Sequence, residues 1–103
     1  SSWTALSDER PKDIIEPIAN GVAKVNQLRA IIGKYKDDEE GTRRPFLIAQ
    51  DVHSVLPEAV NTELEGEWGL SYTGTIPLLV AAIKELSAKV DALQAEVNSL
   101  KGV

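Results

Sequence analysis

Eight apolar side chains follow one another at spacings of three and four residues through the C-terminal part of the chain. In a heptad written a to g, the β-branched members occupy position a and the leucines position d, a pattern typical of a helix that packs along one stripe. It predicts one long helix over residues 73–101, with Thr73 as N-cap, Pro77 in the first turn and Gly102 at the end. We call the eight residues the seam: Ile76, Leu79, Ile83, Leu86, Val90, Leu93, Val97 and Leu100.

The length of this helix limits what can cover the seam. About 28 residues at 1.5 Å each make a helix of about 42 Å, and the rest of the 103-residue chain is too small to cover a stripe of that length. The alternative is an amphipathic helix packed on its own domain. The length favours a coiled coil with other copies of the chain, although the e and g positions offer only Glu96 and Lys101 as an obvious pair.

Composition narrows the class of function. The chain has no Cys and one His, which leaves no disulfide framework and no zinc site, and we expect no metal and no cofactor. A net charge of −5 argues against a nucleic-acid partner. The longest apolar stretch, Ile76–Ile83, is too short to span a membrane. We therefore expect a soluble single domain over residues 1–103.

The residues before the long helix predict a small mixed head, residues 7–72, and an α+β fold. Short apolar runs alternate with turn residues, which indicates several short elements. A short helix begins near Pro17, and a second helical segment buries Val52 and ends at Pro57. The predicted strands are residues 28–36, followed by an acidic loop over 37–41, then residues 45–50, and a turn and strand within 65–73.

Three features suggest sharper functions but have ordinary alternatives. His53 could be a general base, but a lone histidine on a short helix is more often a surface residue. Trp3, Trp68 and Tyr72 could stack on a carbohydrate, but scattered aromatic residues more often pack in a core or an interface. The acidic run 37–40 could bind a cation, but it lacks the ligand spacing of a calcium loop. None of these is assigned a role.

Ser7 and Lys12 lie five residues apart in the sequence SDERPK. A serine hydroxyl becomes a good nucleophile when a base takes its proton, and a lysine can serve as that base only when its amine is neutral. Ser-Asp before a proline is also an ordinary turn or capping signal. Taken alone, the pair favours a solvated turn.

The segments that follow change this balance. SDERPK is followed in order by DIIEPI, VNQLRAIIGKYK, IAQDVHSVLPEAV and SYTGTIPLLVAAIKEL. This order resembles the C-terminal intramolecular chaperone domain of phage tail spikes and tail fibres, best known from endosialidase tail spikes. The resemblance extends from Ser7 to about Leu86.

The resemblance implies a self-cleaving serine peptidase whose only substrate is its own chain. Such a domain guides folding and trimerisation of a tail spike or fibre, and then cuts itself off before the motif serine. Here that bond is Leu6–Ser7, with residues 1–6 upstream of it. Ser7 matches the nucleophile and Lys12 the base of a Ser-Lys dyad. Asp8 and Arg10 match motif positions with structural roles.

The partners implied are two further copies in a parallel homotrimer and the upstream spike or fibre of the same polypeptide. The resemblance also implies that the domain acts in the host cytoplasm during virion assembly, and that the cut domain is released or stays transiently attached. In isolated parallel coiled coils the a and d pattern of the seam favours two strands, so the trimer prediction rests on the resemblance.

Pro11 departs from the family pattern, which has an aliphatic residue there. A proline fixes its own φ and pushes Arg10 toward extended conformations, which could displace Lys12 from Ser7. Pro11 and the six residues before Ser7 therefore favour the alternative of a non-catalytic trimerisation module at the tip of a fibre. The hypothesis that favours cleavage is that the dyad becomes active only after the head packs against the other chains of the trimer.

Overall fold

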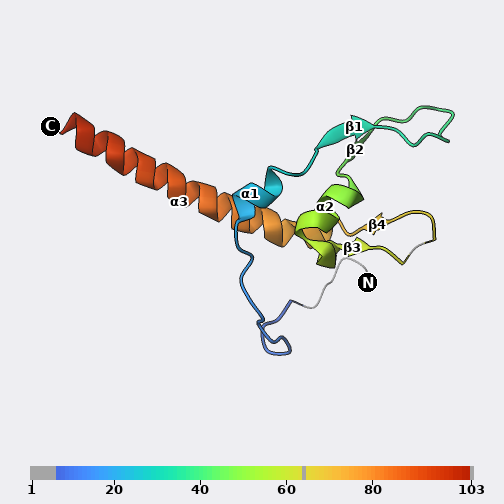
Figure 1. The fold of residues 1–103 in the computed structure, drawn as a ribbon, viewed down its shortest axis with the longest axis horizontal. Coiled ribbons are helices and arrows are strands. Elements are labelled where there is room, and N and C mark those ends of the chain that lie inside the picture. The colour runs from blue at the N-terminus through green and yellow to red at the C-terminus, as the bar shows by residue number, and fades with distance from the viewer. Residues whose placement is uncertain (1–6, 64, 103) are drawn as a thin grey trace.

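The computed structural model describes residues 7–63 and 65–102, which form a small α+β head and one long helix (Figure 1). The predicted class is confirmed at this level. The molecule measures 63 × 40 × 25 Å, and α3 and the head together make up the long dimension. The elements in chain order are α1 (Gly21–Val25), β1 (Ile31–Gly33), β2 (Arg44–Phe46), α2 (Ala49–Val55), the 3₁₀ turn η1 (Pro57–Ala59), β3 (Val60–Asn61), β4 (Gly69–Leu70), the 3₁₀ turn η2 (Thr73–Thr75) and α3 (Ile76–Lys101).

Two short antiparallel hairpins replace the longer strands that the sequence predicts. In the first, Ile31 of β1 pairs with Phe46 of β2, and the acidic run 37–40 lies in the connecting loop as predicted. In the second, β3 pairs with β4. The predictions of strands over 28–36 and 45–50 were too long, because only three residues of each side pair and α2 already begins at Ala49.

The core is small and lies where α2 and η1 meet the start of α3. Val52 and Leu78 are fully buried, and Ala59 and Ala82 nearly so. The predicted helical segment is confirmed, since α2 buries Val52 and ends just before Pro57. Arg29, whose guanidinium Nε lies 2.9 Å from a carboxylate oxygen of Asp51, attaches the base of the first hairpin to α2.

Helix α1 crosses α3 at very close range. Gly21 is buried, and a Cβ at this position would lie 2.6 Å from the backbone nitrogen of Ala82. The N–H of Val22 donates to a carboxylate oxygen of Glu85 at 3.1 Å. The predicted helix start near Pro17 was wrong: Asn20 has a φ of 57°, a left-handed conformation that interrupts a helix before Gly21.

The start of α3 also differs from the prediction. Thr73 is not its N-cap, because residues Thr73–Thr75 form a 3₁₀ turn and Thr75 precedes the α-helix. The backbone of Tyr72 is already helical, so no extended capping residue is available, and the Thr75 hydroxyl donates instead to the Tyr72 carbonyl at 2.6 Å. Pro77 lies in the first turn and Gly102 follows the last helical residue, both as predicted.

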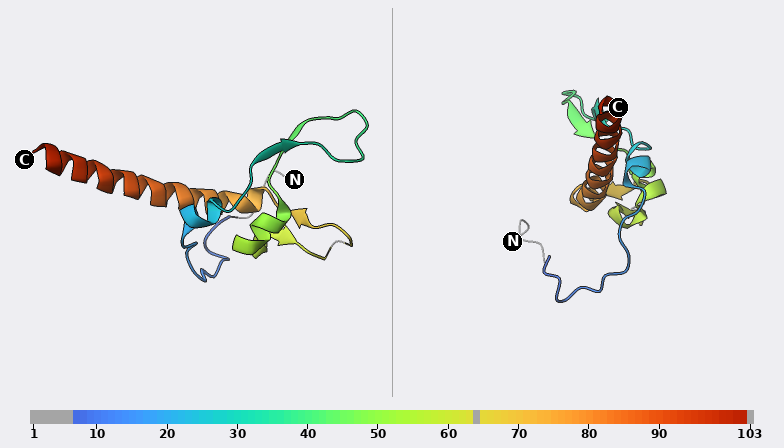
Figure 2. Two further views of the ribbon diagram at one scale, coloured as in Figure 1. Left: turned by 45° about the horizontal axis from the view of Figure 1, so that its top comes forward. Right: turned by 90° about the vertical axis from the view of Figure 1, so that its left-hand side faces the viewer.

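The two sides of α3 have different surroundings. The head packs against heptad positions c, f and g, where Leu78 and Ala82 are buried and Glu85 meets α1. All eight seam residues remain 39% to 76% exposed. Figure 2 shows that the C-terminal half of α3 extends beyond the head with no other described segment beside it. The alternative in which the seam packs on its own head is therefore wrong for the single chain.

Candidate functional site

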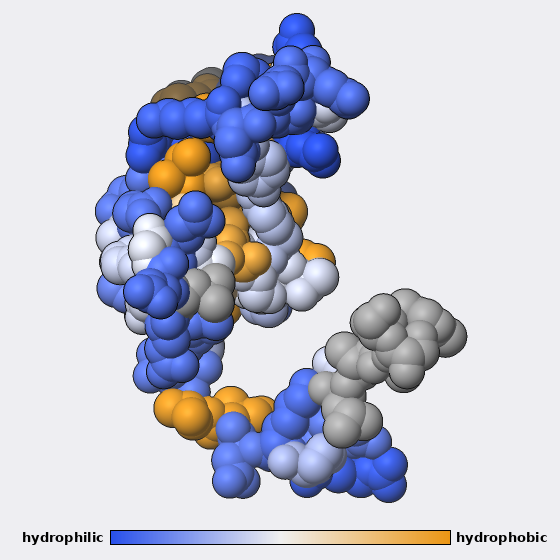
Figure 3. Space-filling view, turned by 90° about the vertical axis from the view of Figure 1, so that its right-hand side faces the viewer, coloured by the Kyte–Doolittle hydropathy of each residue, from blue (hydrophilic) through white to orange (hydrophobic). Residues whose placement is uncertain are grey.

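The candidate dyad lies in an arm, residues 7–18, that precedes α1 and has no regular secondary structure. The N-terminal part of the arm stands away from the head (Figures 1 and 3), whereas residues 15–18 line a pocket together with the end of α2, η1 and the start of α3. Its apolar residues Ile14 and Ile15 are 76% and 89% exposed, and Figure 3 shows an apolar patch on this part of the molecule. An extended segment with exposed isoleucines is typical of a chain that packs against another surface.

A turn in the arm brings the two candidate side chains together. The N–H of Lys12 donates to the carbonyl of Glu9 at 2.9 Å, which closes the turn. The amine Nζ of Lys12 then lies 3.1 Å from the hydroxyl Oγ of Ser7, within hydrogen-bond distance. This is the separation that a nucleophile and its base require.

Asp8 and Arg10 form a close ion pair in the same turn. One carboxylate oxygen, Oδ1, accepts the backbone N–H of Arg10 at 2.9 Å, and the other, Oδ2, accepts its guanidinium Nη2 at 2.7 Å. These hydrogen bonds from Arg10 hold the pKa of Asp8 below its ordinary value, and the same pairing raises the pKa of Arg10.

The single chain leaves this site open to water. Ser7 and Lys12 are both exposed, and so are the other residues of the turn. Leu6, which would supply the carbonyl of the expected scissile bond, lies outside the described residues, as does Trp3. Within the described part of the chain, the turn thus provides a paired hydroxyl and amine whose neighbouring residues are exposed.

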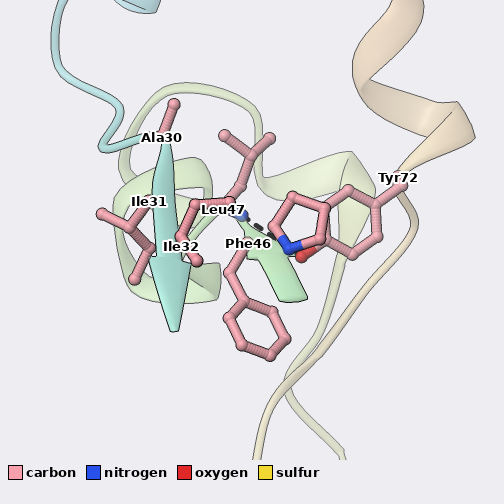
Figure 4. A pocket seen from close by; sticks show the side chains of 7 residues that line it. Ala30, Ile31, Ile32, Phe46, Leu47 and Tyr72 are labelled. Atoms are coloured by element: carbon pink, nitrogen blue, oxygen red, sulfur yellow. Dashed lines mark hydrogen bonds between the residues drawn. The ribbon is translucent and has the colours of Figure 1, made fainter. Parts of the chain in front are cut away.

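An apolar groove of about 600 Å³ lies beside the first hairpin (Figure 4). Tyr72 forms one wall, and its hydroxyl accepts the N–H of Leu47 at 3.2 Å. His53 packs against Trp68 with ring centroids 4.8 Å apart, while Trp68 and Tyr72 remain 39% and 47% exposed. The groove is lined by Ala30, Ile31, Ile32, Pro45, Phe46, Leu47 and Tyr72.

The acidic loop satisfies its own backbone. The Asp38 carboxylate accepts the N–H groups of Glu40 and Thr42 at 3.0 and 3.1 Å, which stabilises the turn that Gly41 completes with a φ of 68°. Across residues 7–63 and 65–102, no three His, Asp or Glu side chains are grouped so as to hold a metal ion. Nor does any helix within these ranges have the length and apolar character to span a bilayer.

Comparison with known proteins links the arm and the head to one family. The model of the Peptidase S74 family, described as chaperone of endosialidase, matches residues 7–61. The chain is 36% identical over 99 residues to long tail fiber protein Gp37 of Enterobacteria phages K3 and T2, which covers 88% of this chain and 8% and 7% of those proteins. It is 32% identical over 102 residues to a probable tail fiber protein of Escherichia phage Phieco32, covering 93% of this chain and 14% of that protein.

The chain spans only a small part of the length of these curated relatives. The family match begins at Ser7 and includes the turn with the two candidate side chains, both hairpin strands β1 and β2, α2 and η1. It covers more than half of the 103 residues. The chain therefore belongs to the chaperone of endosialidase family, within a group of relatives that are phage tail fibre proteins.

Proposed function

We propose that this domain is an intramolecular chaperone that drives folding and trimerisation of a phage tail fibre and then releases itself by cutting the Leu6–Ser7 bond. One observation carries the catalytic part: the amine of Lys12 lies 3.1 Å from the hydroxyl of Ser7, at the residue where the family match begins. The family to which the chain belongs bears the name of a peptidase and the description of a chaperone, which supports both parts.

The proposed reaction uses the two side chains in turn. The amine of Lys12 accepts the proton of the Ser7 hydroxyl, and the oxygen attacks the carbonyl carbon of Leu6. The peptide bond between Leu6 and Ser7 breaks, and Lys12 returns the proton to the departing nitrogen of Ser7. Water then hydrolyses the ester that links Leu6 to the Ser7 oxygen. The products are a free carboxylate on the fibre and a domain that begins at Ser7.

The exposed position of the dyad supports control by assembly. A lysine amine in water has a pKa near 10.4, so only about four in ten thousand are neutral at pH 7. Burial against apolar surface favours the neutral amine. Burial of the exposed Ile14 and Ile15 side chains would favour packing of the arm against a neighbouring copy of the chain, and this packing would exclude water from the turn. Cleavage would then follow trimer formation.

The seam supports assembly through α3. Its eight side chains are half-exposed in the single chain, and burying each against partner helices contributes on the order of 1 kcal/mol. The head occupies a different face of the helix, so partner helices can approach the seam without displacing it. We expect a parallel trimer, with the heads selecting three chains because the seam pattern by itself favours two.

The test is the mass of a precursor that carries native residues upstream of Ser1. We expect the purified wild-type trimer to separate at neutral pH into an upstream fragment and a domain that starts at Ser7. Ser7→Ala and Lys12→Arg should both leave the precursor whole, since a guanidinium keeps its proton in proteins. A wild-type trimer that stays uncut would favour the alternative, a non-catalytic trimerisation module.

A further inference from the structure

We propose that Asp8 and Arg10 are positioning residues for self-cleavage: their ion pair holds the turn that joins Ser7 to Lys12 and neutralises a carboxylate that would otherwise favour a protonated lysine. This inference rests on the proposed peptidase function. The two residues contribute no group to the reaction itself. They act through the conformation and the electrostatic surroundings of the dyad.

The geometry of the pair explains how it holds the turn. Oδ1 of Asp8 accepts both the backbone N–H of Arg10 at 2.9 Å and its Nε at 3.2 Å, while Oδ2 accepts Nε at 3.1 Å and Nη2 at 2.7 Å. A carboxylate bound by one guanidinium and one N–H has little freedom to rotate. Residues 8–10 are thereby fixed from both the side chain and the backbone.

The fixed segment lies between the two members of the dyad. Five residues of extended chain span up to about 17 Å, whereas Ser7 Oγ and Lys12 Nζ lie 3.1 Å apart. The turn that the pair stabilises overlaps the turn closed by the Lys12 N–H on the Glu9 carbonyl at 2.9 Å. Loss of the pair should therefore lower the fraction of chains in which the dyad is formed.

The charges around the lysine give the second part of the argument. Asp8, Glu9 and Asp13 place three carboxylates close to Lys12 in sequence, and Arg10 is the cation among them. A nearby carboxylate favours the ammonium form of a lysine, and a nearby cation favours the neutral amine. Arg10 pairs with the carboxylate next to Ser7, and its hydrogen bonds are the largest cause of the lowered pKa of Asp8. Because these residues flank Ser7 and Lys12 in one exposed turn, we expect their charges to act on the dyad.

Two substitutions should move the pH dependence of cleavage in opposite directions. Arg10→Ala leaves the Asp8 carboxylate unpaired, so the pH–rate profile of the precursor should move to higher pH. If the pH–rate profile moves up by about one pH unit, the cleavage rate at pH 7 should fall about tenfold. Asp8→Asn keeps an oxygen that can accept the backbone N–H of Arg10 but leaves the guanidinium charge unpaired, so its profile should move to lower pH. A purely structural role would slow both variants without opposite displacements.

Two further variants separate charge from geometry. Arg10→Lys keeps the positive charge but lacks the planar guanidinium that binds both carboxylate oxygens. The cleavage rate of this variant should therefore fall, while its pH–rate profile should stay near that of the wild type. Glu16→Gln removes an exposed carboxylate from the same arm, beyond Lys12, and should match the wild type. Profiles of Arg10→Ala and Asp8→Asn that overlie the wild type would overturn the inference, as would an equal displacement in Glu16→Gln.

Failure of the proposed function would be distinguished by NMR on the uncut precursor. If the wild type does not cleave, the titration of the Lys12 side chain and the solvent exchange of its amide N–H can still be measured. We expect Arg10→Ala to raise the pH at which the side chain loses its proton and to speed exchange of the amide, and Asp8→Asn to lower that pH. Unchanged titration and exchange in both variants would reject the positioning role independently of cleavage.

Discussion

Replacing Gly21 with alanine should loosen the crossing of α1 over α3. The added Cβ would lie 2.6 Å from the backbone nitrogen of Ala82, 2.8 Å from its Cα and 2.9 Å from the carbonyl carbon of Ala81. Ordinary van der Waals contacts begin near 3.4 Å. All three atoms belong to the backbone of a helix, so no side chain can rotate away. Helix α1 would have to retreat by roughly 1 Å.

The expected loss follows from two opposing effects. Forcing an extra methyl group into a close contact costs about 1–3 kcal/mol, while alanine favours a helical backbone over glycine by up to about 1 kcal/mol. The net effect should be a decrease of about 1–2 kcal/mol in the free energy of unfolding. The retreat should also lengthen the hydrogen bond from the Val22 N–H to Glu85, now 3.1 Å.

Urea unfolding followed by circular dichroism measures this loss, at one fixed protein concentration so that any association of chains is the same in both variants. Gly33→Ala is the matched control, because its Cβ would meet the Phe46 ring at 3.4 Å, an ordinary contact. That variant should be as stable as the wild type or more stable by less than about 1 kcal/mol. A Gly21→Ala protein with wild-type stability, or equal losses in both variants, would refute the close crossing of α1 and α3.

Three further predictions concern the seam, the acid response and the turn of the arm. Leu86→Asp should dissociate the proposed trimer in sedimentation equilibrium, because it places a charge in the seam, whereas Ala88→Asp, at exposed position f of the same heptad, should leave it assembled. The hydrogen bond from the Val22 N–H is the largest cause of the lowered pKa of Glu85. The ionised Glu85 carboxylate therefore stabilises the folded protein fully above pH 4.5, its ordinary pKa, and this stabilisation is lost as the pH falls through the lowered pKa. Glu85→Gln should therefore be less stable at pH 7 and lose less stability on acidification in urea titrations. Pro11→Leu should speed cleavage of the precursor, followed by mass spectrometry, because a proline just before Lys12 disfavours the turn that the Lys12 N–H closes. An unchanged rate would show that Pro11 does not strain this turn.

The long helix was the part of the fold most open to prediction from sequence. Its periodicity is a local property, and the structure has α3 over Ile76–Lys101 with Pro77 and Gly102 where expected. The start was misplaced by three residues, because the choice between a capping residue and a 3₁₀ turn depends on the backbone of Tyr72. The Tyr72 hydroxyl accepts the N–H of Leu47, which lies 25 positions earlier in the chain, so the surroundings of this turn include distant residues that a local pattern does not reveal.

The head was harder to predict because distant residues determine its local structure. Glycine disfavours a helix by its own propensity, yet Gly21 is the residue that lets α1 approach Ala82, which lies 61 positions along the chain. The predicted strands were too long because the alternation of apolar residues in the sequence does not reveal where the pairing between strands ends. Each strand of the first hairpin ends after three residues.

The candidate site was anticipated by motif rather than by geometry. A spacing of five residues does not by itself bring Ser7 and Lys12 together. The structure adds the turn and the ion pair between Asp8 and Arg10, in which Nη2 of Arg10 lies 2.7 Å from Oδ2 of Asp8. The pair was not predicted, and the signal that could have indicated it is an acidic residue followed two positions later by an arginine.

The small core gives a physical reason for cleavage to depend on assembly. Among the described residues only Val52 and Leu78 are large side chains that are fully buried, so burial of apolar surface offsets little of the conformational entropy lost when the head is ordered. Leu78 comes from α3, so the head requires that helix, and an isolated helix with an exposed seam is itself marginal. Partner helices that bury the seam would stabilise α3, and α3 would then stabilise the head to which the arm is attached. We therefore expect the folded head, and with it a positioned dyad, to become populated only as chains associate.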